Sequence, residues 1–170
     1  MADFDVGAVY RALDERREER ALTWAQVTRE INDAFGGTAG PRPISPSTVR
    51  GLRDRTVVEG DGVLQMLRWL GRSPESFVPA HPLAGDPETV LPEVGPDRIL
   101  RWDAGALHRA LQEQRTARRL TWADVAAQTG CPAAGLRGLA TASRVSFPGV
   151  MRIVGWLGRP AAHFVRATTW

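Results

Sequence analysis

Residues 120–139 read Leu120-Thr-Trp-Ala-Asp-Val-Ala-Ala-Gln-Thr-Gly130-Cys-Pro-Ala-Ala-Gly-Leu-Arg-Gly-Leu139. Thr121 stands directly before a short run with an inward-facing Val125, which is the usual place of a helix N-cap. Gly130 follows that run and predicts the end of the helix. Pro132 then precedes a second short run, in which leucines 136 and 139 face inward. The stretch therefore predicts two short helices joined by a tight turn that contains glycine.

The same pattern occurs twice in the chain. Residues 50–52 and 69–72 recur at an offset of 87, as residues 137–139 and 156–159. Before them, ten residues recur at a constant offset of 98, and they are Asp5, Gly7, Arg11, Ala12, Leu13, Leu22, Thr23, Trp24, Ala25 and Val27. The difference of 11 indicates one insertion in the first copy, at about residues 32–43. A duplicated module is typical of a protein whose ligand offers two equivalent places to bind.

Apolar spacing predicts five helices in each copy. Thr23 with Gln26 fits a capping box, and Ser45 before Pro46 fits an N-cap with proline at the first helical position. A short fifth helical segment is expected at residues 73–77, with its counterpart at 160–164. The inward-facing residues of the first four helices of the first copy are Val6, Val9, Tyr10, Leu13, Val27, Ile31, Val49, Leu52, Val63, Met66, Leu67 and Leu70.

No alternating strand pattern is visible, so we expect an all-α fold with two tandem five-helix domains. The first domain spans residues 1–78 and the second spans residues 99–170. The prolines of residues 79–98 predict a semi-rigid linker that lies over the surface. Domains of roughly 75 residues are near the lower limit for an independent core. The single cysteine, Cys131, excludes an internal disulfide.

Residues 120–139 resemble the phage-repressor-like (XRE-type) helix-turn-helix family. The first copy resembles the same family, through residues 22–24 and 44–52. Together the two copies cover nearly all of the chain except the linker. The resemblance implies that the second helix of each motif lies in the major groove of double-stranded DNA, while the first helix crosses the backbone.

The resemblance also implies phosphate contacts at the start of the first helix of each motif. Thr23 and Thr121 would offer a hydroxyl and a helix N-terminus to a phosphate. Trp24 and Trp122 stand where the family usually carries a polar residue that contacts phosphate. Each indole N–H can donate one such hydrogen bond. The alternative is that each tryptophan packs between helices.

The base-reading helix departs from the family pattern in both copies. The expected DNA contacts of this region are Arg42, Ser45, Ser47, Thr48, Arg50 and Arg53 in the first copy and Ala133, Ala134, Arg137 and Arg144 in the second. Alanine can touch a thymine methyl but donates no side-chain hydrogen bond to a base. We therefore expect the first copy to discriminate sequence and the second to hold the backbone. Ordinary surface positions for Arg50 and Arg137, and an ordinary flexible insertion around Arg42, are the alternatives.

The charge distribution also favours the second copy as the one that attracts nucleic acid. All 22 basic residues are arginine, which binds phosphate in a bidentate manner. Residues 1–80 hold eleven arginines and twelve acidic residues, whereas residues 99–170 hold ten arginines and three acidic residues. Three of those arginines (115, 118 and 119) form a cluster, for which a solvated helix face is the alternative.

These patterns together predict a double-stranded DNA-binding transcriptional regulator, most simply a repressor. The chain would act as a covalent pseudo-dimer on an asymmetric operator, with its two motifs about one helical turn (~34 Å) apart. We expect no catalysis, cofactor or metal, because His81, His108 and His163 lack ligand spacing. Without an apolar run long enough for a membrane span, or a secretory signal, we expect a cytoplasmic, nucleoid-associated protein. The alternative is a degenerate motif that binds a protein, as an antitoxin or adaptor does, or that forms a homodimer.

Overall fold

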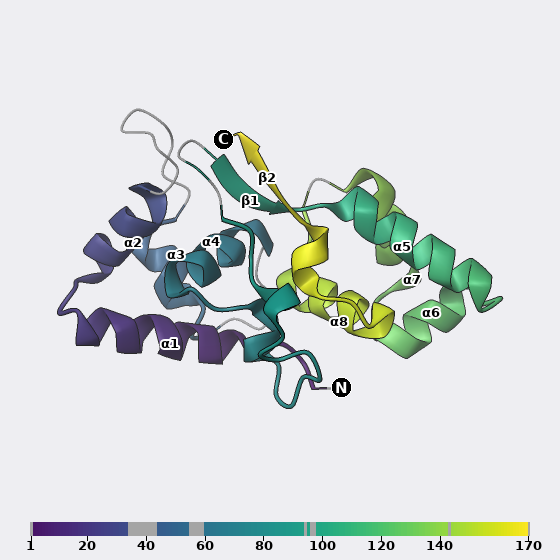
Figure 1. The fold of residues 1–170 in the computed structure, drawn as a ribbon, viewed down its shortest axis with the longest axis horizontal. Coiled ribbons are helices and arrows are strands. Elements are labelled where there is room, and N and C mark those ends of the chain that lie inside the picture. The colour runs from purple at the N-terminus through teal and green to yellow at the C-terminus, as the bar shows by residue number, and fades with distance from the viewer. Residues whose placement is uncertain are drawn as a thin grey trace.

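The computed structural model describes residues 2–33, 44–54, 60–93, 95, 98–142 and 144–169. These residues form the helices α1 (Val6–Glu19), α2 (Trp24–Asp33), α3 (Pro46–Gly51), α4 (Gly60–Leu70), α5 (Ala104–Ala117), α6 (Trp122–Thr129), α7 (Ala133–Gly138) and α8 (Phe147–Leu157). They also form the strands β1 (Arg98–Trp102) and β2 (Val165–Thr169) and the short 3-10 helices η1 (Pro74–Phe77), η2 (Pro87–Thr89), η3 (Leu139–Thr141) and η4 (Ala161–Phe164). Figure 1 shows two helical lobes, α1–α4 and α5–α8, with the two strands where the lobes meet.

The element boundaries repeat at the two offsets found in the sequence. Helices α1 and α5 start and end 98 residues apart, while α3 and α7, α4 and α8, and η1 and η4 do so 87 residues apart. Backbone strain repeats as well. Ala21 and Arg119, which are equivalent non-glycine residues, both have positive φ, at 52° and 56°. The duplication therefore extends from residue identities to unusual backbone conformations.

The local signals that predicted these helices are confirmed. Thr23 Oγ1 accepts the Gln26 N–H (3.2 Å), and Gln26 Oε1 accepts the Thr23 N–H (2.8 Å), which completes the capping box. Ser45 caps α3, and Gly130 ends α6 in the left-handed region with φ of 75°. The apolar residues expected in the core of the first copy are buried, except for Tyr10, which is half-buried. Neighbours along the chain were sufficient to place these elements.

The expected, mainly helical class is confirmed, but β1 and β2 add a two-stranded antiparallel sheet that was not expected. The register places Arg98 opposite Thr169 and Trp102 opposite Val165. Ile99, Leu100 and Trp102 of β1 are all buried. Since β1 is buried on both faces, it lacks the alternation of polar and apolar residues that marks a strand with one solvated face.

The two copies do not have separate cores, because the buried apolar residues of both form one cluster. The ring of Phe147, at the start of α8, lies 4.5 Å from the ring of Phe4 and 5.1 Å from that of Trp102 (centroid distances). Phe4 and Trp102 are themselves equivalent residues of the two copies. The lobes therefore share a core, and neither covers its apolar surface alone.

In each copy, the segment before the first helix packs against the fourth helix of the other copy. At the first junction β1 lies on α4, where Gln65 Nε2 donates to the Leu100 carbonyl (2.6 Å) and Asp61 Oδ1 accepts the Trp102 N–H (3.1 Å). At the second junction residues 2–4 lie on α8, where Arg152 pairs with Asp3 through bonds of 2.8 and 3.0 Å. This reciprocal exchange resembles the self-complementary interface of a symmetric dimer.

Residues 79–93 of the proline-rich segment contain a regular element and buried side chains, which their composition did not predict. Residues 87–89 form η2, with Thr89 buried, and His81 is buried as well. The segment thus packs on the protein at these points rather than only crossing its surface. Within the described residues, no helix combines the length and apolar character needed to cross a membrane.

Candidate nucleic-acid interface

In the first copy, the residues expected at the start of α2 belong to a stack of side chains. The Trp24 ring stacks on Tyr10, with centroids 5.6 Å apart, and the Arg17 guanidinium lies 5.0 Å from the Trp24 centroid. Arg53 lies 6.0 Å above the Tyr10 ring and 3.7 Å from the Asp54 carboxylate. Trp24 therefore packs between helices, while Thr23 is exposed and caps α2.

The second copy repeats this stack with one ring exchanged. The Trp122 ring stacks on His108 at 5.7 Å, and the Arg115 guanidinium lies 4.9 Å from the Trp122 centroid. Thr121 caps α6 and is exposed. Both tryptophans thus fix the angle between the first two helices of their copy, through an aromatic partner and an arginine.

Helix α3 carries a cluster of hydroxyl groups at its N-terminus. Ser45 Oγ accepts the Thr48 N–H (3.1 Å) and lies 2.9 Å from Ser47 Oγ and 2.8 Å from Thr48 Oγ1. Ser47 and Arg50 are exposed. Arg42, expected nearby, lies outside the described residues. The exposed face of α3 therefore offers a serine hydroxyl and a guanidinium, with Arg53 just beyond its end.

Helix α7 presents a flatter face. Ala133 is half-buried, whereas Ala134, Gly135 and Arg137 are exposed. Arg144, also exposed, follows η3. Figure 1 places α3 and α7 in different lobes, so the two sets of expected contacts are not brought into one cluster.

Equivalent arginines keep their place in the two copies but differ in the charge beside them. Arg17 donates to Asp14 Oδ1 through Nε (2.8 Å) and Nη2 (2.6 Å). Arg115 donates in the same way to Gln112 Oε1, at 3.3 and 3.0 Å. Both arginines also donate to the carbonyl of the leucine that precedes the capping threonine, at 3.2 and 2.9 Å. The amide accepts the same bonds without neutralising the cation.

A second carboxylate is exchanged for an amide on the opposite helix. In the first copy Glu30 accepts from Arg20 (2.6 and 2.8 Å) and from Trp69 Nε1 (2.8 Å). In the second copy Gln128 accepts from Trp156 Nε1 (2.8 Å), and Arg118 lies over the Trp156 ring at 5.0 Å.

The hydrogen bonds to Glu30 affect the charge of its carboxyl group. The hydrogen bonds from Arg20, and then from Trp69, hold the pKa of the Glu30 carboxyl below its ordinary value. That carboxylate therefore stays charged and offsets the Arg20 cation, whereas Gln128 offers Arg118 no such compensation.

At the start of α6 the exchange goes the other way, because there the second copy has the carboxylate and the first copy has the amide. Asp124 Oδ2 accepts the N–H and the hydroxyl of Thr121, both at 2.8 Å, where the first copy has the neutral Gln26. The backbone hydrogen bond from Thr121 lowers the pKa of Asp124. A carboxylate thus already occupies the N-terminus of α6, so it competes with any phosphate there. Even so, formal charge rises from −1 over residues 14–30 to +1 over residues 112–128.

The residues that sequence reasoning missed are the partners of the arginines. Gln112 and Gln128 carry no recognisable motif. Their signal is a comparison of the copies at the 98-residue offset, which aligns them with Asp14 and Glu30. Arg115 and Arg118 were expected from the sequence, but the exchange of the carboxylates beside them was not.

Within the described ranges, no group of three or more His, Cys, Asp or Glu side chains is placed to hold a metal ion. No protein-family model, curated protein or solved structure matches the chain.

Proposed function

We propose that the chain is a regulator that binds double-stranded DNA through the exposed faces of α3 and α7, as a covalent pseudo-dimer of two XRE-type motifs. The second copy supplies most of the electrostatic attraction, and the hydroxyl and guanidinium groups of α3 supply most of the sequence discrimination. Such a protein works in the cytoplasm at the nucleoid, where it represses by blocking access to DNA.

The observation that carries this proposal is the exchange of carboxylates for amides around Arg115 and Arg118. The exchange keeps the hydrogen bonds of Arg17 and Trp69, which recur at Arg115 and Trp156, whereas the Arg20–Glu30 bonds have no counterpart among the described contacts of Arg118. It leaves two guanidinium groups without carboxylate partners among the described contacts of α5 and α6. Attraction for phosphate is a physical reason to favour amides here, because each uncompensated arginine near DNA releases counterions on binding.

The flat face of α7 fits a role in holding the backbone. Ala134 and Gly135 have little side chain, so the helix can approach a groove wall closely, and Arg137 is the exposed long donor on α7. Its counterpart Arg50 occupies the same position on α3, beside Ser47. The two lobes would therefore contact DNA unequally, which predicts an asymmetric site.

The test gives the second copy carboxylates at the two positions where the first copy has them. The double variant Gln112→Asp with Gln128→Glu copies the first copy and should keep the fold. Binding to duplexes, selected from a random pool and from scrambled sequence, is measured by fluorescence anisotropy over a salt series. We expect roughly tenfold weaker binding near 0.1 M salt, and a salt dependence reduced by about two phosphate contacts.

A matched control adds the same charge elsewhere. Ala84→Glu with Val90→Glu places two carboxylates on exposed positions of the linker and should change affinity little. Equal losses in the two double variants would show only a net-charge effect and contradict the proposal. So would wild-type protein that binds no duplex at low salt.

One observation favours a second candidate, a protein-binding module. A mainly apolar groove of about 360 Å³ lies between α7 and α8, with Cys131, Leu136 and Val145 in its lining. In the first copy Ile44 stands in place of Cys131, and its Cδ1 would lie 3.6 Å from a Cβ at Gly62 of α4. A module of this kind would show no duplex binding at any salt concentration.

A further inference from the structure

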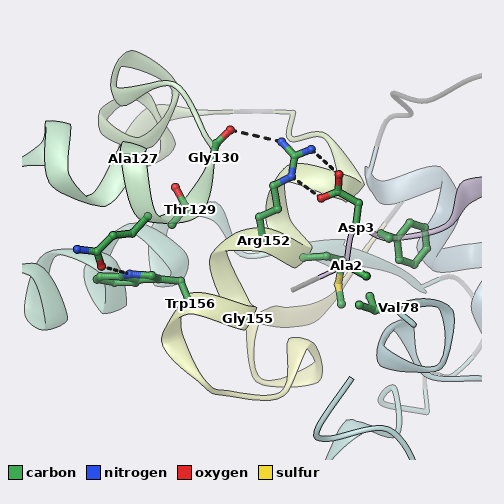
Figure 2. A pocket seen from close by; sticks show the side chains of 12 residues that line it. Ala2, Asp3, Val78, Ala127, Thr129, Gly130, Arg152, Gly155 and Trp156 are labelled. Carbon is green, nitrogen blue, oxygen red and sulfur yellow. Dashed lines mark hydrogen bonds and ion pairs between the residues drawn. The ribbon is translucent and has the colours of Figure 1, made fainter. Parts of the chain in front are cut away.

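The second junction between the copies contains a cavity. A cavity of about 510 Å³ lies where residues 2–4 meet α8 and the end of α6. Figure 2 shows the Arg152 side chain at this cavity, between Asp3 and the Gly130 carbonyl, with Trp156 and Gly155 farther along α8. Cavities of a few hundred cubic ångströms that combine apolar walls with a few polar groups are typical small-molecule sites.

The first junction has larger residues at two equivalent positions. Its counterparts of Gly155 and Gly130 are Arg68 and Asn32. Arg68 donates to the Arg98 carbonyl (3.4 Å), and Asn32 holds the backbone of Ile44 through bonds of 2.7 and 3.2 Å. The two glycines of the second copy therefore lack the side chains that their counterparts in the first copy use for hydrogen bonds to backbone groups.

The cavity already holds one carboxylate. The Arg152 guanidinium donates to the Asp3 carboxylate through Nε (2.8 Å) and Nη2 (3.0 Å). Its Nη1 donates to the Gly130 carbonyl (3.4 Å). The counterpart of Arg152 in the first copy is Gln65, which is uncharged and holds the backbone of Leu100. At this position of the fourth helix, a guanidinium that can bind a carboxylate is thus present in the second copy and absent from the first.

The Asp3 carboxylate is a weakly held occupant. Its side chain is 61% exposed and that of Arg152 is 39% exposed, so the pair is screened by water. Asp3 sits on the segment just before α1, and Phe4 rather than Asp3 anchors that segment in the core. Asp3 can swing into solvent while Arg152 stays in place on α8.

The remaining walls suit an aromatic ring. Phe4, Val78 and Met151 are buried apolar residues that line the cavity, and Trp156 adds a half-buried indole. Rings and thioethers of this kind attract a further aromatic group beyond simple burial of area.

We propose that this cavity binds a small aromatic monocarboxylate, whose carboxylate replaces Asp3 on Arg152 while its ring packs against Phe4, Met151 and Trp156. The site spans both copies and touches the end of α6, directly before the turn into α7. It depends on the geometry of the second junction and does not require that the chain bind DNA.

The test uses phenylacetate as the probe and the full chain. Binding is followed by NMR, through the amide signals of Gly130 and Gly155. We expect saturable shifts of these two signals at up to millimolar phenylacetate. Phenylacetamide, acetate and inorganic phosphate each lack the charge, the ring or the shape, and should give no saturable shift.

Three variants separate the contributions. Asp3→Asn removes the internal competitor and should tighten binding about fivefold, the factor that corresponds to an exposed ion pair of about 1 kcal/mol. Arg152→Gln should abolish binding. Gly155→Arg copies the first junction and should also block the cavity, while it leaves Arg152 present. Arg166→Gln, on β2, is the control and should bind like the wild type.

Two results would overturn the site. One is equal shifts with phenylacetamide, since the ring alone would then account for binding. The other is unchanged phenylacetate affinity in a folded Arg152→Gln or Gly155→Arg protein.

Discussion

The two copies repeat two sets of hydrogen bonds, one made by an arginine of the first helix and one from a tryptophan of the fourth helix to the second helix, but the acceptors differ in charge. Arg17 and Arg115 make matching hydrogen bonds, one to a carboxylate and the other to an amide. Trp69 and Trp156 donate to Glu30 and Gln128 at the same 2.8 Å. The comparison teaches that geometry and charge are separable here. A duplicated module can keep its fold while one copy becomes more cationic than the other.

The two junctions between the copies also differ, in the size of one pair of equivalent residues. Gly60 and Phe147 are equivalent residues at the starts of α4 and α8, yet one has no side chain and the other fills the space between Phe4 and Trp102. A Cβ on Gly60 would lie 2.6 Å from the Trp102 ring. A duplicated pair has thus become one large and one small residue, so that two equivalent helix ends fit a single shared core.

The largest effect is expected from Phe147→Ala. This ring is fully buried at the point where the copies meet, so its loss should cost about 3–5 kcal/mol of unfolding free energy. Urea denaturation followed by circular dichroism and tryptophan fluorescence measures the loss. Because the core is shared, both signals should change in one transition. Two separate transitions would show that the copies unfold independently.

Gly60→Ala tests the small member of the same pair. The added methyl group meets the Trp102 ring and, at 2.9 Å, the Val145 carbonyl, and such overpacking should cost about 1–3 kcal/mol. Gly62→Ala is a matched control on the same helix, because its nearest neighbour is Ile44 Cδ1 at 3.6 Å. That control should be neutral or stabilising. Equal destabilisation by both variants would contradict the close contact.

The next effect concerns charge. Asp14→Asn with Glu30→Gln gives the first copy the amides of the second and should strengthen duplex binding by roughly tenfold in the anisotropy assay. Glu15→Gln with Glu19→Gln, at exposed positions of α1, is the control with the same change in net charge. If the control variant gains as much affinity for the duplex, the position of the charge does not matter. The different partners of the arginines would then not explain a difference in DNA binding.

The smallest effect is a difference in acid sensitivity. The folded pKa of Glu30 lies below its ordinary value because Arg20 and Trp69 donate to its charged form. Its contribution to stability is therefore present above the ordinary pKa and is lost as pH falls through the lowered value. Glu30→Gln should remove that part of the acid dependence, a change in Tm on the order of 1–2 °C for an exposed pair. Melting curves of both proteins at neutral and acidic pH measure this change. If Tm of the variant depends on pH as it does in the wild type, the pair contributes nothing to stability.

Local sequence was sufficient for the helices and their caps. Thr23, Ser45 and Gly130 act on backbone groups within about one turn of themselves, and a spacing of three or four residues sets which face of a helix is apolar. The same locality explains what the sequence left open at the candidate interface. Trp122 could pack or contact phosphate, and the choice depended on His108 and Arg115, which belong to the preceding helix.

The sequence by itself determined the duplication, the order of the helices and the surplus of arginine in the second copy, because these depend on residue identity and short-range periodicity. Tertiary structure alone decided the β1–β2 ladder, the shared core and the exchange of leading segments. The Arg152–Asp3 pair joins residues 149 positions apart, and Gln65 reaches Leu100 across 35. Such contacts form only when the two lobes pack together, since no local pattern fixes which distant backbone or charge a side chain will meet.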